Sequence, residues 1–135
     1  MIYLLDTNTC IRYLNASSLL IREKIEKINP NDISICSVVK AELFYGAMKS
    51  QNSNKNLIKL KKFFDRFFSF SFDDEASRVY GSIRSKLESA GTPIGPNDLM
   101  IASIAISNHL TLLSHNVREF ERVKDLLLED WEEKI

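Results

Sequence analysis

The sequence lacks a long apolar run. None of its 135 residues belong to a stretch near the roughly 18 apolar residues that a membrane-spanning helix needs. No basic region precedes the short apolar run at the N-terminus, and Asp6 interrupts that run at once. This pattern is typical of a buried strand and not of a signal peptide. We therefore expect a cytoplasmic protein that does not associate with a membrane.

The chain has only two cysteines and two histidines, and its net charge is zero. The two cysteines, Cys10 and Cys36, without a signal peptide, indicate free thiols in a reducing compartment, and we expect both to pack in the core. Neither His109 nor His115 has a partner at metal-ligand spacing. Because 18 basic residues balance 18 acidic ones, nucleic-acid binding would need a local basic patch.

What remains is the composition of a folded domain. An apolar content of 44% with 27% charged residues is ordinary for a globular protein, and the length fits one domain over residues 1–135. Apolar and β-branched runs predict strands at residues 2–5, 33–37, 70–72, 111–114 and 125–131. Helical patterns are predicted over residues 7–14, 18–28, 38–48, 56–68, 73–90, 96–108 and 117–122, with a flexible loop over 50–56. This alternation predicts an α/β fold with a mainly parallel sheet.

Acidic residues follow the predicted strands. Asp6 comes directly after the first strand, Glu42 lies in about the first turn of the helix after the second, and Asn116 and Glu119 follow the TLLS strand. Ligand sites in open α/β sheets gather at these carboxyl ends. Asp98, which begins the helix before TLLS, joins them only if the tertiary fold brings it to the same edge.

Carboxylates gathered in this way repel one another unless a cation compensates their charge. Oxygen ligands without nearby histidine or cysteine favour a hard ion, Mg²⁺ with Mn²⁺ as a substitute, and such a centre suits phosphodiester hydrolysis. Each residue alone has another interpretation. Asp6 suits a helix cap, Glu42 a solvated helix face, Asp98 a helix dipole and Asn116 a turn.

Four blocks follow one another along the chain: YLLDTNTCIRYL, ISICSVVKAELFYGAMKS, GTPIGPNDLMIASIA and TLLSHNVREFERVKDLLLEDW. With these blocks the sequence resembles, over essentially its whole length, the PIN-domain ribonucleases and among them the VapC toxins of bacterial toxin–antitoxin pairs. The resemblance implies a single PIN domain, built as a three-layer α/β/α sandwich.

The resemblance also implies roles for matching positions. Asp6, Glu42 and Asp98 match the acidic metal-site and catalytic positions, and Glu119 matches an acid of this subgroup and is implied as a further catalytic residue. Asn116 falls where many PIN domains carry a further acid, and it is implied as a metal ligand that supplies an uncharged oxygen. The neighbours implied to orient the carboxylates are Thr7, Asn8, Ser37 and Ser114, the last replacing a usual threonine.

The same resemblance implies that the protein is a Mg²⁺-dependent endoribonuclease. It would cleave structured RNA, with tRNA a frequent substrate, and so inhibit translation. The resemblance further implies a homodimer and a cognate VapB-like antitoxin whose C-terminal segment lies over the active-site groove; operator DNA is bound only through the antitoxin. Arg12 and Lys40, close in sequence to the acids, are candidate RNA phosphate contacts. The basic residues between positions 49 and 66 form either an RNA-binding surface or a solvated helix face; they are Lys49, Lys55, Lys59, Lys61, Lys62 and Arg66. The phenylalanines of residues 63–68 either line a groove for a partner helix or pack in the core.

Two rival functions remain. A haloacid-dehalogenase-type phosphotransferase also starts with a strand and a nucleophilic aspartate, but it usually has a second aspartate two residues later, where this chain has Asn8. A catalytically inactive PIN module would bind only RNA or a protein partner. Such a module is expected to lack the acidic residues of the metal site, whereas Asp6, Glu42 and Asp98 are all present in this chain.

Overall fold

The structure, a computed structural model, describes residues 1–132, so the last three residues of the predicted domain lie outside the described part. The strands are β1 Tyr3–Leu5, β2 Ile33–Cys36, β3 Phe68–Phe70, β4 Thr111–Leu113 and β5 Leu127–Glu129. The helices are α1 Thr7–Leu14, α2 Leu19–Lys27, α3 Ser37–Met48, α4 Ser53–Phe64, α5 Asp74–Ser89, α6 Pro96–Ser107 and α7 Val117–Phe120, with a 3₁₀ turn, η1, at Pro30–Asp32.

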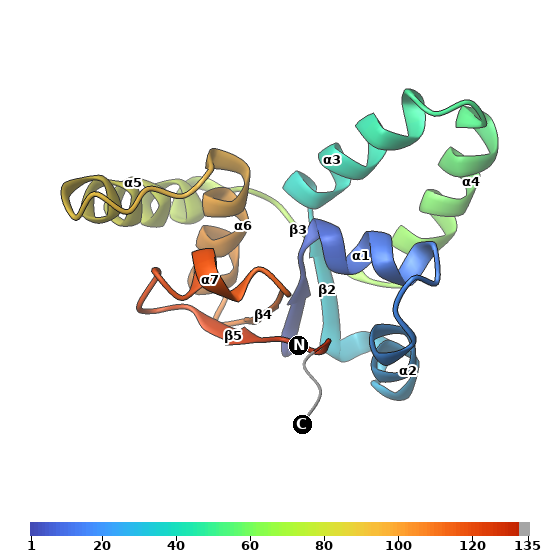
Figure 1. The fold of residues 1–135 in the computed structure, drawn as a ribbon, viewed down its shortest axis with the longest axis horizontal. Helices are drawn as coiled ribbons and strands as arrows, with labels where there is room; N and C mark the ends of the chain where they lie inside the picture. The colour runs from blue at the N-terminus through green and yellow to red at the C-terminus, as the bar shows by residue number, and fades with distance from the viewer. Residues whose placement is uncertain (133–135) are drawn as a thin grey trace.

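The five strands form one parallel sheet in the order β3-β2-β1-β4-β5. Helices α1 to α4 lie on one side of this sheet and α5 to α7 on the other (Figure 1). The predicted three-layer α/β/α sandwich is therefore confirmed, and all strand pairs in the described residues are parallel.

The order of the strands reverses at β1. From β1 the chain passes through α1 and α2 to β2 on one side, whereas it enters β4, the other neighbour of β1, from α6 on the opposite side (Figure 1). A crevice forms at such a switch point, outside the carboxyl ends of the strands. Helix α6 runs back against the direction of β4, so its first turn lies at this same edge, which brings Asp98 toward Asp6.

The central strands are uninterrupted apolar runs because both of their faces are buried in the core. Leu4, Leu5, Ile33 and Ile35 are fully buried, as expected for strands covered by helices on both faces. The thiols of Cys10 and Cys36 also lie in this core as predicted, and burial raises the pKa of both, that of Cys36 to about 11. No helix among the described residues is long and apolar enough to cross a membrane.

Three predicted details are wrong. Helix α4 begins at Ser53 and ends at Phe64, so it takes up residues 53–56 of the loop predicted over residues 50–56. The third strand lies at Phe68–Phe70, two residues earlier than predicted, because pairing with β2 fixes its register. Glu42 is the sixth residue of α3 and lies in its second turn.

The phenylalanines of residues 63–68 divide between core and surface. Phe63, Phe64 and Phe67 are buried, which supports core packing over a partner groove. Phe68 is 56% exposed on the edge strand β3.

Candidate active site

Asp6 lies where β1 passes into α1 and is 5% exposed. Its Oδ1 accepts a hydrogen bond from the backbone N–H of Thr9 at 2.8 Å, which caps the helix. Burial raises the pKa of this carboxyl and Glu42 adds to the rise, while hydrogen bonds from Ser114 and Thr9 oppose it. Asp6 is thus both a cap and a buried acid, and the two interpretations of this residue are compatible.

Glu42 reaches the same edge from the second turn of α3. The Thr7 hydroxyl, at the start of α1, donates to Glu42 Oε1 at 2.8 Å. This bond joins two helices that follow different strands, and it fixes one carboxylate oxygen of Glu42. Thr7 therefore contacts a predicted site acid, and its role in orienting that acid stays a prediction.

Asp98 is the point at which the acids meet. It lies in the first turn of α6, where the helix dipole favours a negative charge. Nevertheless its pKa is raised to about 6, first by burial and then by the charges of Asp6, Glu119 and Glu42. The tertiary fold thus brings Asp98 to the other acids.

Glu119, in α7, contributes to this cluster through its charge on Asp98. The Asn116 side-chain amide donates to Glu119 Oε2 at 3.4 Å, which leaves the Asn116 carbonyl oxygen available as a neutral ligand. The Ser114 hydroxyl accepts the backbone N–H of Asn116 at 3.0 Å and also bonds Asp6. Ser114 therefore connects the turn after β4 with the acid after β1.

Other predicted residues have different contacts. The Ser37 hydroxyl accepts the backbone N–H of Phe72 at 3.3 Å, so it ties the segment before α5 to α3, and its predicted role toward a carboxylate stays a prediction. Asn8 is exposed on α1. Arg12 pairs with Glu132 Oε1 at 3.2 Å, and the Lys40 ammonium lies 5.3 Å from the centre of the Phe64 ring.

A second group of possible ligands was missed by sequence reasoning. Nδ1 of His115 lies 2.9 Å from Asp130 Oδ2 and 3.5 Å from Glu132 Oε2. Within residues 1–132, this is the one place where three such ligand atoms lie within 4.8 Å of one another. The separation of 15 residues between His115 and Asp130 gives no local signal, because only the pairing of β4 with β5 brings them together.

The chemistry of Asp6, Glu42, Asp98 and Glu119 fits a divalent cation. Their donors are all oxygens, which suits a hard ion that keeps bound waters. The oxygens of these carboxylates lie farther apart than the ligand atoms of the His115 group. Burial raises the pKa of Asp98 most, and the charges of the neighbouring acids add to the rise. A cation removes this repulsion, so the cluster is a better candidate for a catalytic metal than the histidine group, where Arg12 already neutralises Glu132.

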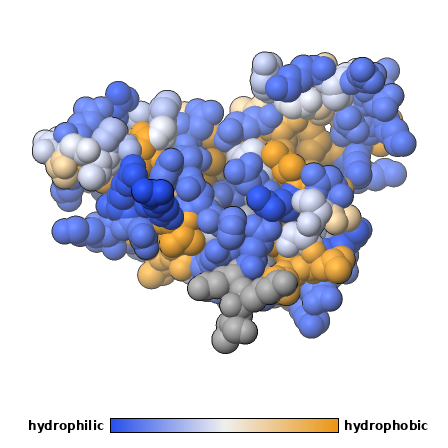
Figure 2. Space-filling view, in the orientation of Figure 1, coloured by the Kyte–Doolittle hydropathy of each residue, from blue (hydrophilic) through white to orange (hydrophobic). Residues whose placement is uncertain are grey.

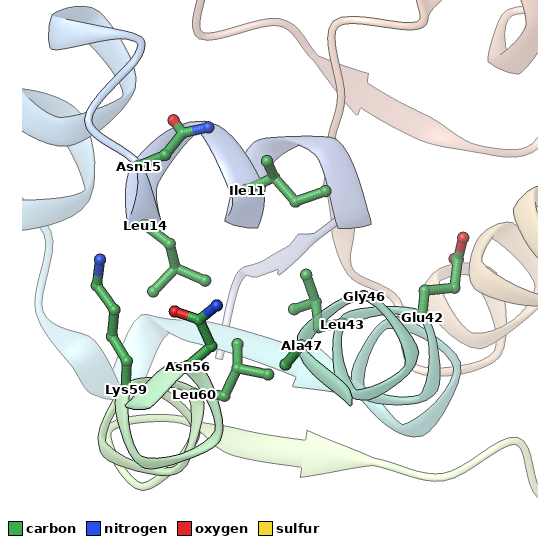
Figure 3. Close-up of a pocket in the computed structure, with 10 residues that line it drawn as sticks. All are labelled: Ile11, Leu14, Asn15, Glu42, Leu43, Gly46, Ala47, Asn56, Lys59 and Leu60. Atoms are coloured by element: carbon green, nitrogen blue, oxygen red, sulfur yellow. The ribbon is translucent and has the colours of Figure 1, made fainter. Parts of the chain in front are cut away.

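An apolar groove runs from this cluster between α1 and the α3–α4 pair. It encloses about 270 Å³ and has Ile11 and Leu14 on one wall and Leu43 and Leu60 on the other, with Glu42 at one end (Figure 3). Apolar side chains are visible in the hollow between α1 and these helices in Figure 2.

Comparison with known proteins gives one matching family model, described as PIN domain, which covers residues 3–126. The chain is 41% identical over 133 residues to a protein named Ribonuclease VapC2 of Rickettsia felis, covering 98% of this chain and 99% of that relative. It is 40% identical over 129 residues to a protein named tRNA(fMet)-specific endonuclease VapC of Salmonella typhimurium, covering 96% and 97%.

Solved structures agree in fold. DNA-bound VapBC from Salmonella typhimurium matches with a TM-score of 0.91 and 39% identity, covering 97% of this chain and 98% of the other. VapBC2 from Rickettsia felis, bound to a DNA fragment from its promoter, matches with a TM-score of 0.90 and 40% identity, covering 97% and 99%.

Proposed function

Because the chain belongs to the PIN-domain family, we propose that it is a metal-dependent endoribonuclease, the toxin of a VapBC-type toxin–antitoxin pair. Its substrate is structured RNA, in particular tRNA, and its cleavage inhibits translation. Relatives of nearly equal length carry the names ribonuclease and tRNA(fMet)-specific endonuclease, which supports this substrate class.

One observation carries the proposal. Asp98 is surrounded by the charges of Asp6, Glu119 and Glu42 at the switch point of the sheet. Packing alone gives no reason to gather four acids around a partly buried position, since each adds to the repulsion there. A cation that binds a phosphodiester gives that reason.

The residues divide the work as follows. Asp6, Glu42 and Asp98 would hold Mg²⁺ or Mn²⁺, and Asn116 would add a neutral oxygen. An ion held there would supply a water of lowered pKa as the nucleophile and positive charge for the leaving oxygen. Glu119 would accept a proton from that water, and Thr7 and Ser114 would hold the orientation of the acids.

The partners are an antitoxin and a second copy of this chain. The apolar groove ends at Glu42, so an antitoxin segment lying in it would cover the metal site. Structures of similar proteins are described as VapBC bound to DNA, in keeping with binding of operator DNA through the antitoxin. Arg12 and Lys40 remain candidate phosphate contacts, each after release from its present partner.

The second candidate is an inactive PIN module that binds RNA or protein. The acids of the cluster disfavour it, because a module that only binds has no need for them. The phosphotransferase interpretation is wrong, since the chain belongs to the PIN-domain family.

Cleavage of a total tRNA pool tests the proposal. Purified, antitoxin-free protein should cut it with Mg²⁺ or Mn²⁺ and not with EDTA, and Asp6→Asn should abolish cutting because it removes a charged ligand. Asparagine also caps helices well, so the fold should survive. The matched control is Asp73→Asn, which changes the corresponding cap of α5, where Asp73 Oδ1 accepts from Ala76 N–H at 2.9 Å.

Asp73→Asn should cleave as the wild type does. Cleavage by Asp6→Asn at the wild-type rate would contradict the assignment of the site. Absence of cleavage by the wild type with either metal, on tRNA and on total RNA, would favour the binding module.

A further inference from the structure

Next to the acidic cluster, on the side away from the apolar groove, lies an open hollow between α3 and α6. These helices contact each other at the carboxyl edge of the sheet (Figure 1). The hollow has a volume of about 630 Å³, within the range of small-ligand sites. We call it the α3–α6 hollow; its lining includes Val38, Ala41, Glu42, Tyr45, Asn97 and Met100.

We propose that the α3–α6 hollow binds one unstacked nucleobase of the substrate RNA, with Tyr45 as the stacking surface and Asn97 as the hydrogen-bonding group. This inference rests on the proposed function, which it extends to the conformation of the RNA. It assigns a role in substrate recognition to two residues outside the acidic cluster.

Tyr45 provides an exposed aromatic surface. Its side chain projects from α3 one turn beyond Glu42 and is 66% exposed. The ammonium of Lys49, one turn further, lies 4.8 Å from the centre of the Tyr45 ring. Aromatic rings beside a positive charge are the usual platform for single-stranded nucleic acid, since the ring stacks on a base while the cation meets a phosphate.

Asn97 provides a hydrogen-bonding group on the opposite wall. It follows Pro96 at the start of α6 and is exposed. Its amide makes no hydrogen bond to any group in residues 1–132, so both its donor and its acceptor are available there. An amide that can both donate and accept is able to form hydrogen bonds with the edge of an unstacked base.

The position of the hollow fixes which nucleotide enters it. Glu42 lines the hollow and also belongs to the acidic cluster, and Asn97 precedes Asp98. A base in the hollow therefore belongs to a nucleotide next to the cleaved phosphate. Such a base cannot remain paired and stacked in a helix, so cleavage requires an unpaired segment, such as a loop, within the structured RNA.

RNA binding in EDTA tests the inference without cleavage. Poly(U) and poly(A) single strands should each compete with labelled tRNA for the full-length protein, and the poly(A)·poly(U) duplex should compete much less. Tyr45→Ala should weaken single-strand binding on the order of tenfold, Asn97→Ala should weaken one homopolymer more than the other, and Tyr45→Phe should retain binding. Under cleavage conditions Tyr45→Ala should raise KM more than it lowers kcat.

The matched control is Phe68→Ala, which also removes an exposed aromatic ring, 56% exposed against 66% for Tyr45, at the start of β3 and so at the opposite end of the strands. It should leave binding unchanged. Equal binding of tRNA by Tyr45→Ala and wild type, or preference for the duplex, overturns the inference and leaves the nuclease in place. Loss of self-association or antitoxin binding in Tyr45→Ala, with unchanged RNA binding, assigns the surface to a protein partner instead. A wild type that neither binds nor cuts RNA overturns the proposed function itself.

Discussion

The charged carboxylate of Asp98 suits metal binding but lowers the stability of the metal-free fold. Its raised pKa, about 6 against an ordinary 3.8, means that the folded protein without metal disfavours the charged form. Such a group stabilises the fold fully below pH 3.8, and this contribution is lost as the pH rises through about 6. At neutral pH the metal-free protein therefore carries a negative charge at Asp98 that burial, and after it the neighbouring acids, make unfavourable.

Asp98→Asn should accordingly stabilise the metal-free protein while abolishing cleavage. Removing the charge should raise the free energy of unfolding by about 1 kcal/mol at pH 7, allowing for partial exposure of the group to solvent, and raise the melting temperature by a few degrees. Thermal unfolding in EDTA at pH 7 and pH 4 measures this, and the gain should be smaller at pH 4. Asp125→Asn, which changes an exposed aspartate in the loop before β5, is the control and should change neither value. A destabilised Asp98→Asn would show that the charge has structural partners that this account omits.

The sequence alone was enough to predict which acids gather at the candidate site, but it did not predict the hydrogen-bond partners of nearby polar residues. Asp6, Glu42 and Asn116 follow strands, so the rule for carboxyl ends of parallel strands was enough to gather them. The contacts of Ser37 with Phe72 and of His115 with Asp130 depend on tertiary packing. A polar side chain offers several equally good local bonds, and only the fold selects among them.

At the scale of elements, α1 and α3 are joined by one hydrogen bond between side chains. Thr7→Val removes the hydroxyl that donates to Glu42 Oε1 at 2.8 Å, and keeps the shape of the side chain. Because groups that orient metal ligands commonly contribute tenfold or more, we expect Mn²⁺ affinity and kcat to fall about tenfold. Thr7→Ser should restore both.

Isothermal titration with Mn²⁺ and single-turnover cleavage measure the effect of Thr7→Val, while the melting temperature should change little. Unchanged metal affinity in Thr7→Val would mean that Glu42 is held by α3 alone.

The elements themselves were largely predictable, and the errors have physical causes. The start of α4 was missed because its cap, Asn52, makes no side-chain bond to the helix, and the polar residues around it resemble a loop. Strand β3 was displaced because three aromatic residues at alternate positions, Phe68, Phe70 and Phe72, fit two registers equally well. Pairing of Phe68 with Ser34 selects one of them.

At the scale of the whole molecule, the doubly wound sheet brings acids from four helices or turns to one edge. The sequence predicted this sheet, but not that α6 would start beside β1, because the placement of a helix depends on the strand order β1-β4. Since the acids come from distant segments, their affinity for a cation and their protonation are coupled through the fold.

Metal binding should therefore depend on pH. A proton and a cation compete for Asp98, whose pKa in the metal-free protein is raised to about 6. Mn²⁺ affinity should be nearly constant above pH 7 and fall as the pH drops below about 6. Calorimetric titration at several pH values, at constant ionic strength, measures this. Affinity that stays constant between pH 7 and pH 5 would show that Asp98 does not share the ion's site.

The central claim is that the catalytic cation belongs to the acids around Asp98 and not to His115, Asp130 and Glu132. Electron paramagnetic resonance of bound Mn²⁺ should therefore be compared for the wild type, Asp98→Asn and His115→Ala at pH 7.5. We expect Asp98→Asn to lose bound Mn²⁺ and His115→Ala to keep it with the wild-type affinity. Binding that persists in Asp98→Asn and disappears in His115→Ala would contradict this claim and assign the metal to His115, Asp130 and Glu132.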